Sequence, residues 1–322
     1  MHQKPNEHLI DQHCILCGKS ESVVVMKKFE DGSETEPIIL QKCLACKLVY
    51  LASWELRYSS EDYHYYADRI GKEKSELYCP ITTSRYQDLL ESFKKNCTGN
   101  KLLDFGCGQG HFVEVAVKSG WEASGIELSD PAVTICQNFN LPVKKLDLFS
   151  SDLKPRAYDI ISMFEILEHL SQPAKALTRL EELLKPGGLL YLTTPNFASL
   201  DRKLLGPQGE IIYRGHLSYF TPDTLKHLIN RHSTFETIYL KTRNMSVSAL
   251  RNLFSPKKEN PQKKEASATT GPEKNISERD PLFRQKVESS NFLKFGKHIT
   301  NQGLNWLGWG ATIVALLRKK AD

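Results

Sequence analysis

The stretch that decides the fold is KLLDFGCGQGHF, at residues 101–112. An apolar segment with strand character runs into Gly106, Gly108 and Gly110, and a helical pattern follows. Glycine lets the chain turn sharply and lets a ligand approach the backbone without meeting a Cβ atom. The GxGxG spacing differs from the GxxxxGK[ST] of a triphosphate-binding loop. Asp104 lies two residues before the first glycine, where a carboxylate repels phosphate and attracts a cation.

Strand and helix patterns alternate along the chain from this segment onward. Such alternation predicts an α/β fold with a doubly wound, mostly parallel sheet and helices on both faces. Pro131 and Pro222 each follow a candidate N-cap, which predicts helices that begin there. We expect strands at 101–106, 122–128, 142–147, 158–165 and 188–194, and helices at 77–98 and near 111–119, 131–139, 173–184 and 222–231.

Acidic side chains stand where the expected strands end. Glu127 closes the second strand, Asp147 the third, and Phe164 and Glu165 the fourth. The carboxyl ends of parallel strands meet at one crevice, so these side chains can share a ligand with Asp104. Glu127 can accept both hydroxyls of a ribose, and Asp147 can meet an adenine amine. S-adenosylmethionine, which combines a ribose, an adenine and a cationic amino-acid tail without phosphate, fits this set of demands.

These motifs resemble those of class I S-adenosylmethionine-dependent methyltransferases. Residues 104–110 are similar to the family's first motif, Glu127 to its ribose-binding acid, Asp147 to its adenine-side acid, and 184–196 to its fifth strand. The resemblance implies a Rossmann-like, seven-stranded sheet. It also implies that Asp104, the three glycines, Glu127, Asp147 and Phe164 bind the cofactor.

Two further segments resemble a narrower branch of this family. They are EILEHL at 165–170 and GHLSYFTPDTLKHLI at 215–229. The branch contains ubiquinone-type O-methyltransferases and bacterial methyltransferases of small molecules and sugars. The resemblance implies a small-molecule acceptor, such as a sugar, nucleotide sugar or lipid-linked intermediate, with O- or C-methylation both open.

Two CxxC pairs lie near the amino end, Cys14 with Cys17 and Cys43 with Cys46. Two such pairs, joined by an expected hairpin, can surround one zinc ion tetrahedrally. Four thiolates leave no position open for chemistry, so we expect a closed, structural site. With YSSEDYHYY at 58–66, the pairs resemble the zinc-bearing lead-in of bacterial deoxysugar C-methyltransferases, which implies a small zinc-ribbon-like module that caps the substrate crevice.

Candidate catalytic residues follow the fourth and fifth strands. A hydroxyl acceptor must lose a proton when it is methylated, and a histidine is a natural base near pH 7. We expect this role for His169 or His216, with Glu165 and Glu168 as alternatives. Tyr63, Tyr65 and Tyr66 are candidates to line the acceptor site.

Composition divides the chain further. We expect a four-cysteine zinc-binding module at 1–55, a Tyr-rich connector and helix at 56–98, the cofactor-binding domain at 99–250, a disordered insertion at 251–290, and a final helix and strand at 291–322. The insertion is rich in Pro, Lys, Glu and Ser, and can bury little apolar surface. The tail at 304–320 is too short to span a membrane. It predicts a strand pairing with 235–243, or alternatively a weak membrane-surface anchor.

Charge and composition narrow the classes of function. The chain has 322 residues, with 43 Lys and Arg against 38 Asp and Glu. This small excess, without a dense basic stripe, gives no expectation of nucleic-acid binding. The first residues lack an apolar signal core, so we expect a cytoplasmic protein. Modification of an RNA or protein polymer recognised through the zinc module, and a non-catalytic cofactor-binding module, stay open as alternatives.

Overall fold

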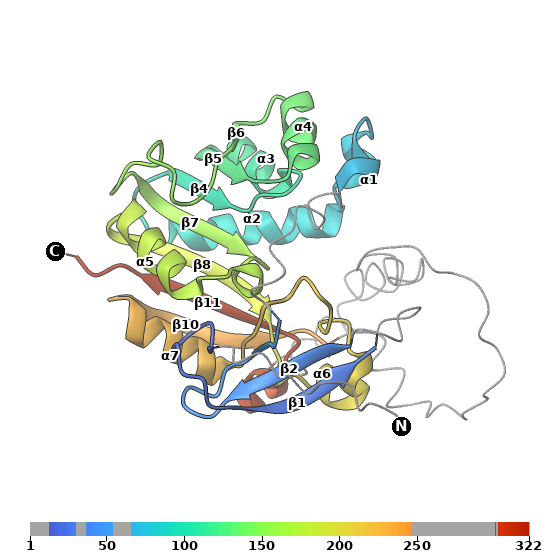
Figure 1. Ribbon diagram of the computed structural model, residues 1–322. Coiled ribbons are helices and arrows are strands. Elements are labelled where there is room, and N and C mark those ends of the chain that lie inside the picture. The colour runs from blue at the N-terminus through green and yellow to red at the C-terminus, as the bar shows by residue number, and fades with distance from the viewer. Residues whose placement is uncertain (1–12, 30–36, 54–65, 246–299, 301, 322) are drawn as a thin grey trace, which may run out of the picture.

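The computed structural model describes residues 13–29, 37–53, 66–245, 300 and 302–321. Its central element is a seven-stranded sheet in the order β10-β11-β8-β7-β4-β5-β6 (Figure 1). Only β11 runs antiparallel to its neighbours. The strands are β4 (Lys101–Phe105), β5 (Glu122–Glu127), β6 (Val143–Lys145), β7 (Tyr158–Phe164), β8 (Leu184–Pro195), β10 (Glu236–Arg243) and β11 (Thr312–Arg318).

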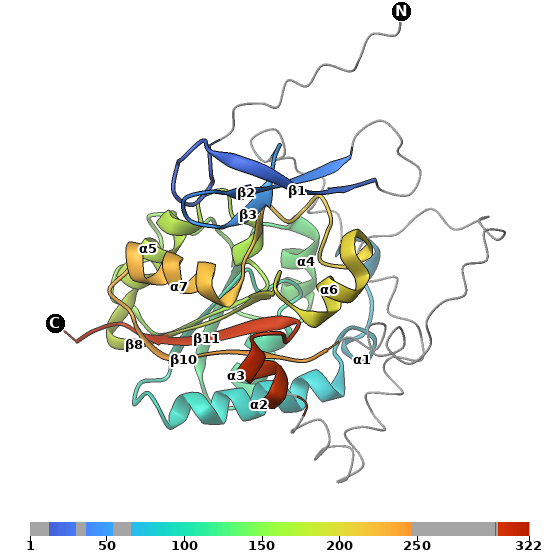
Figure 2. The same ribbon diagram turned by 90° about the horizontal axis from the view of Figure 1, so that it is seen from below.

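Helices cover both faces of this sheet, as predicted. Figure 2 shows α2 and α3 on one side and α5 and α7 on the other. The helices are α1 (Lys74–Leu77), α2 (Pro80–Lys94), α3 (His111–Lys118), α4 (Asp130–Asn138), α5 (Pro173–Leu183), α6 (Leu200–Leu205) and α7 (Pro222–His232). Successive strand residues point to opposite faces. Leu102 accordingly packs against the α2–α3 side, and Leu103 packs in the core that contains α5 and α7.

The expected helix starts and the tail strand are confirmed. The Ser129 hydroxyl caps α4, and Thr221 forms a capping box with Thr224 at the start of α7. β11 pairs with β10 on one side and with β8 on the other, and its central residues are fully buried. β8 begins at Leu184, earlier than expected, because Leu184 already pairs with Tyr158 of β7. Within the described ranges, no helix combines the length and apolarity needed to cross a membrane.

A second, antiparallel sheet contains the cysteine segment. Its order is β1-β2-β3-β9, formed by β1 (Ser22–Lys28), β2 (Ile38–Cys43), β3 (Val49–Leu51) and β9 (Ser218–Tyr219). The predicted hairpin strands are therefore present, while the turn at 30–36 lies outside the described residues, as does the insertion predicted at 251–290. β9 comes from the loop after β8, so this sheet joins the amino-terminal segment to the α/β domain.

Candidate active site

The loop after β4 has the backbone shape that its glycines permit. Gly106 and Gly108 have φ angles of 69° and 51°, in the left-handed region that disfavours other residues. A Cβ atom on Gly106 would lie 2.5 Å from Cδ1 of Ile166, and one on Gly108 would lie 2.6 Å from the hydroxyl of Tyr66. Gly110 is the N-cap of α3. The loop therefore keeps this shape and packs against Ile166 and Tyr66 only while these positions stay glycine.

Asp104 lies beneath this loop and is only 2% exposed. Its neighbour across the β4–β7 ladder is Ser162, whose hydroxyl donates a 2.7 Å hydrogen bond to Oδ1 of Asp104. Burial raises the pKa of Asp104 to about 7, although the Ser162 hydrogen bond acts in the opposite direction. A buried carboxylate with a raised pKa is suited to receive a cationic group of a ligand.

Glu127 ends β5 and faces the same loop. The backbone N–H of Gly108 donates to its Oε2 at 2.9 Å, and the N–H groups of Leu128 and Ser129 donate to its Oε1 at 2.7 and 2.9 Å. A carboxylate offers about four lone-pair positions, so it keeps acceptor capacity for a ribose hydroxyl. These contacts fix the orientation of the Glu127 carboxylate beside the glycine loop.

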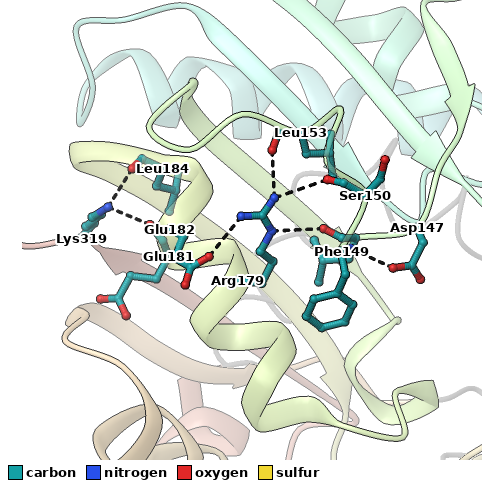
Figure 3. A network of polar contacts seen from close by, with 10 residues as sticks. Asp147, Phe149, Ser150, Leu153, Arg179, Glu181, Glu182, Leu184 and Lys319 are labelled. Atoms are coloured by element: carbon teal, nitrogen blue, oxygen red, sulfur yellow. Dashed lines mark hydrogen bonds and ion pairs between the residues drawn. The ribbon is translucent and has the colours of Figure 1, made fainter.

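Asp147 lies on an exposed loop after β6, where it accepts a 2.7 Å hydrogen bond from the backbone N–H of Phe149. Arg179 of α5 fixes this loop (Figure 3). Its guanidinium donates to the carbonyl oxygen of Leu153 at 2.8 Å and contacts those of Leu148 and Ser150 at 3.4 and 3.5 Å. Arg179 thus holds the loop that carries Asp147, and a binding role for Asp147 stays a prediction.

The segment before α1 and α1 itself approach the glycine loop from outside. Tyr66 contacts Gly108, and Arg69 donates to the Gln109 side chain at 3.2 Å. The Tyr78 hydroxyl donates to the Gln109 carbonyl at 2.8 Å. Tyr66, predicted as a candidate to line the acceptor site, therefore lies against the glycine loop, whereas Tyr63 and Tyr65 fall outside the described residues.

Phe164 and Glu165 close β7 in different environments. The Phe164 ring packs against Tyr86, Phe112 and Tyr191, with centroids 4.9–5.4 Å apart. Glu165 has a left-handed backbone, with φ at 53°, and its side chain is accessible from a pocket. Desolvation raises the pKa of Glu165 to about 7, although the Thr193 hydrogen bond and the Arg243 guanidinium act in the opposite direction. Strained backbone of this kind is concentrated at functional sites.

That pocket lies between the ends of β7, β8 and β11. Its polar lining residues are Glu165, Ser199, Asp201, Arg202, Glu210 and Thr312. The Arg202 guanidinium donates to the carbonyl of Phe197 at 2.8 Å and lies over the Phe197 ring. The pocket wall is mostly apolar, with Pro195, Leu205, Ile211 and Ala311, and three carboxylates and one guanidinium are set into it.

Three further candidates meet beside this pocket. Glu168 and His169 lie in a 3-10 turn after β7, and His216 lies in the loop before β9. One ligand atom from each of the three side chains lies within 4.8 Å of the others. Glu168 is 1% and His216 6% exposed. The structure thus brings together the two histidines that the sequence could only place on separate loops.

The four amino-terminal cysteines also converge. Sγ of Cys14 lies 3.5 Å from Sγ of Cys46, and Sγ of Cys17 lies 3.5 Å from Sγ of Cys43. All four sulfur atoms lie within 4.8 Å of one another. Zn–S bonds of about 2.3 Å in a tetrahedron separate the sulfurs by roughly 3.8 Å, so this cluster could hold zinc.

The two CxxC turns have the same backbone form. The N–H of Gly18 donates to the carbonyl of Cys14 at 2.8 Å, and the N–H of Lys47 donates to that of Cys43 at 3.1 Å. Gly18 and Lys47 both have left-handed φ angles, 70° and 65°. Each turn therefore presents its two thiols in the same way to one centre.

Sequence reasoning missed several residues that support these sites. Ser162 binds Asp104, and Thr194 binds the Glu168 carboxylate. Arg179 binds the 147–153 loop. A serine within the apolar strand 158–164 was a usable signal, since buried hydroxyls need partners. Arg179 gave no signal, because it lies on an amphipathic helix among other charged residues.

Comparisons with known proteins agree with this architecture. Residues 80–236 match the family model described as a methyltransferase domain. Over 118 residues the chain is 34% identical to a ubiquinone biosynthesis O-methyltransferase of Methylococcus capsulatus, covering 34% of this chain and 49% of the relative. Over 105 residues it is 31% identical to the enzyme of the same name from Vibrio atlanticus, covering 30% and 44%. The chain thus spans about half the length of the curated relatives it matches.

A solved S-adenosylmethionine-dependent methyltransferase from Archaeoglobus fulgidus superposes with a TM-score of 0.49 and 18% identity, covering 74% of this chain and 93% of that one. The family match and the strand order identify residues 80–236 as a methyltransferase domain with a Rossmann-like fold.

Proposed function

We propose that the protein transfers a methyl group from S-adenosylmethionine to a hydroxyl of a small-molecule acceptor. The observation that carries this proposal is the pair of acids at the glycine loop: Asp104, buried beneath it, and Glu127, bonded to its Gly108 N–H. Asp104 would meet the cationic amino-acid part of the cofactor, and Glu127 its ribose. The curated relatives, named as O-methyltransferases, support oxygen as the atom that is methylated.

The pocket at the end of β7, the strand that pairs with β4, is the proposed acceptor site, with Glu165 as general base. The acceptor O–H gives its proton to the Glu165 carboxylate, and the acceptor oxygen forms a bond to the methyl carbon. The C–S bond breaks, and its electron pair neutralises the sulfonium and leaves S-adenosylhomocysteine. A pKa of about 7 keeps roughly half of Glu165 ionised at neutral pH, which suits a base.

The carboxylates around this pocket favour an acceptor with several hydroxyl groups. Glu165, Asp201 and Glu210 are hydrogen-bond acceptors, and Arg202 is a donor. A sugar, nucleotide sugar or lipid-linked sugar intermediate offers the matching donors and acceptors. We also propose that one structural zinc ion is bound by Cys14, Cys17, Cys43 and Cys46. The short distances among their sulfur atoms support this part of the proposal.

The test is transfer of labelled methyl groups from S-adenosylmethionine onto a panel of nucleotide sugars, lipid-linked sugars and simple phenols. We expect product with a sugar-bearing acceptor. Glu165→Gln should lower kcat by about 10²–10⁴-fold and leave cofactor affinity unchanged. Cofactor binding without transfer to any acceptor would instead identify a non-catalytic binding module. Transfer to phenols alone would refute the sugar acceptor.

A further inference from the structure

The cluster of Glu168, His169 and His216 has an arrangement that the methyl-transfer proposal does not explain. Each side chain contributes one ligand atom, and these three atoms lie within 4.8 Å of one another. The two imidazole centroids are 4.8 Å apart, with the rings at 66°. The cluster is mostly buried, because Glu168 and His216 are 1% and 6% exposed.

Backbone carbonyl groups determine which ring nitrogens carry protons. Nδ1 of His169 lies 2.8 Å from the carbonyl oxygen of Gly215, and Nδ1 of His216 lies 2.8 Å from that of Ile211. A carbonyl oxygen can only accept, so each Nδ1 must donate. In the neutral rings, each Nε2 then offers a lone pair. Both Nε2 atoms are therefore acceptors, and the Tyr213 hydroxyl already lies 3.4 Å from Nε2 of His169, a contact that a metal ion there would replace.

The Glu168 carboxylate adds a third acceptor. Its Oε2 accepts a 2.8 Å hydrogen bond from the Thr194 hydroxyl. Its Oε1 is buried and has no hydrogen-bond partner among the described residues. Nε2 of His216 lies 3.9 Å from this oxygen, which is too long for a hydrogen bond. A buried oxygen without a donor is costly, so this atom requires a partner.

A cation placed among these three side chains would give the buried Oε1 of Glu168 a partner, and the imidazole lone pairs would complete its coordination.

We infer that Glu168, His169 and His216 form a binding site for a divalent first-row transition-metal ion, separate from the four cysteines. Two imidazole nitrogens and one carboxylate suit Zn²⁺, Co²⁺, Ni²⁺, Mn²⁺ or Fe²⁺ better than Mg²⁺ or Ca²⁺, which prefer oxygen ligands. The bonds from Nδ1 to Gly215 and Ile211, and from Thr194 to Glu168, are the outer contacts that orient metal ligands in proteins.

Binding requires a small contraction of the cluster. Metal bonds of about 2.05 Å in a tetrahedron separate the ligand atoms by roughly 3.3 Å, against 3.9 Å between Nε2 of His216 and Oε1 of Glu168. Side-chain rotations provide a shift of that size. Three protein ligands leave at least one coordination position for water or for an acceptor hydroxyl. Coordination of the ion by the three side chains does not depend on the proposed function. Only an acceptor hydroxyl in the open position rests on it.

Metal counting on the full-length protein tests the inference without an activity assay. The protein is saturated with Zn²⁺, dialysed and analysed by mass spectrometry, and then loaded with Co²⁺ for absorption spectra. We expect two ions per chain. Co²⁺ at the cysteines gives sulfur-to-metal charge transfer, and the second ion should add visible d–d bands without further charge transfer. Glu168→Gln, which keeps the shape and can still accept from Thr194, should lose only the second ion.

Glu165→Gln, three residues earlier in the same segment, is the matched control and should keep both ions. His169→Gln, at a partly exposed position, is the second variant if Glu168→Gln does not fold. A wild-type protein that takes up only the cysteine-bound ion overturns the inference, as does a second ion retained by both variants. A protein that binds the second ion but transfers no methyl group upholds the metal site and refutes the proposed function.

Discussion

The raised pKa of Asp104 predicts that cofactor affinity depends on pH near neutrality. The carboxyl is 2% exposed, and burial raises its pKa to about 7, with the Glu127 carboxylate adding to the rise. S-adenosylmethionine is cationic, so it favours the ionised carboxylate and lowers this pKa when it binds. The affinity for S-adenosylmethionine is therefore highest above pH 7, where Asp104 is ionised, and it decreases as the pH falls through 7.

The size of the effect follows from linkage. With a pKa of about 7 in the free protein and a much lower one in the complex, the apparent Kd scales as 1 + 10^(7 − pH). This factor is about 11 at pH 6.0 and about 1.3 at pH 7.5. The Kd should thus rise about eightfold between these values, or roughly 1.3 kcal/mol. The titrations stay at or below pH 7.5 because the cofactor's own α-amino group loses its proton at higher pH, and α-amino groups titrate near 7.7–8.0.

Isothermal titration calorimetry at pH 6.0, 6.5, 7.0 and 7.5 measures this change. Repeating the pH 6.0 titration in buffers of different ionisation enthalpy should show release of about one proton per cofactor bound. Asp104→Asn should bind more weakly at pH 7.5 and with a flat pH profile, whereas Glu165→Gln should keep the wild-type slope. A flat profile for the wild type, or a slope that Asp104→Asn retains, would refute the placement of Asp104 against the cofactor's cation.

Three other changes test the neighbouring parts of the structure. Arg179→Lys removes the fork that holds the adenine-side loop, so calorimetry should show a Kd for S-adenosylmethionine several-fold higher, about 1 kcal/mol, while Lys175→Ala on the same helix should have no effect. Gly108→Ala places a Cβ atom in a left-handed, occupied position; we expect cofactor binding to fall tenfold or more and denaturant melts to show a loss of about 1–2 kcal/mol. Cys14→Ser should lose the cysteine-bound zinc in metal analysis and lower the thermal midpoint, since structural zinc provides about 10–16 kcal/mol in zinc-finger peptides; the exposed Cys79→Ser should do neither.

Local patterns predicted the elements that depend on local chemistry. The glycine loop, the caps at Ser129 and Thr221 and the strand at 312–318 each leave a signal within a few residues, and each is present. β9, with only Ser218–Tyr219, was not predicted. It exists because Val49 and Tyr50 pair with it across some 170 residues of sequence, and no short window contains that information.

The candidate site shows the same contrast between features that local sequence signals and features that depend on distant segments. The proximity of Asp104, near the end of β4, and Glu127, at the end of β5, could be predicted because the topology of parallel strands places strand ends together. Their binding roles stay predictions. The cluster of Glu168 with the two histidines could not be assigned. His216 reaches it only because its loop is bonded to the 3-10 turn, where the Leu217 N–H donates to the Glu168 carbonyl at 2.8 Å.

This bond is part of a continuous connection between the cysteine cluster and the acceptor side. The N–H of Cys43 donates to the carbonyl of Leu48, and that of Leu51 donates to the carbonyl of Leu217 at 3.0 Å. Leu217 in turn binds Glu168, and Cys14 and Cys46 share one core with residues of α5 and α7. Loss of order at the cysteines would therefore reach the loop of His216 directly through these hydrogen bonds. Damage there should impair acceptor use and binding of the second metal ion more than cofactor binding.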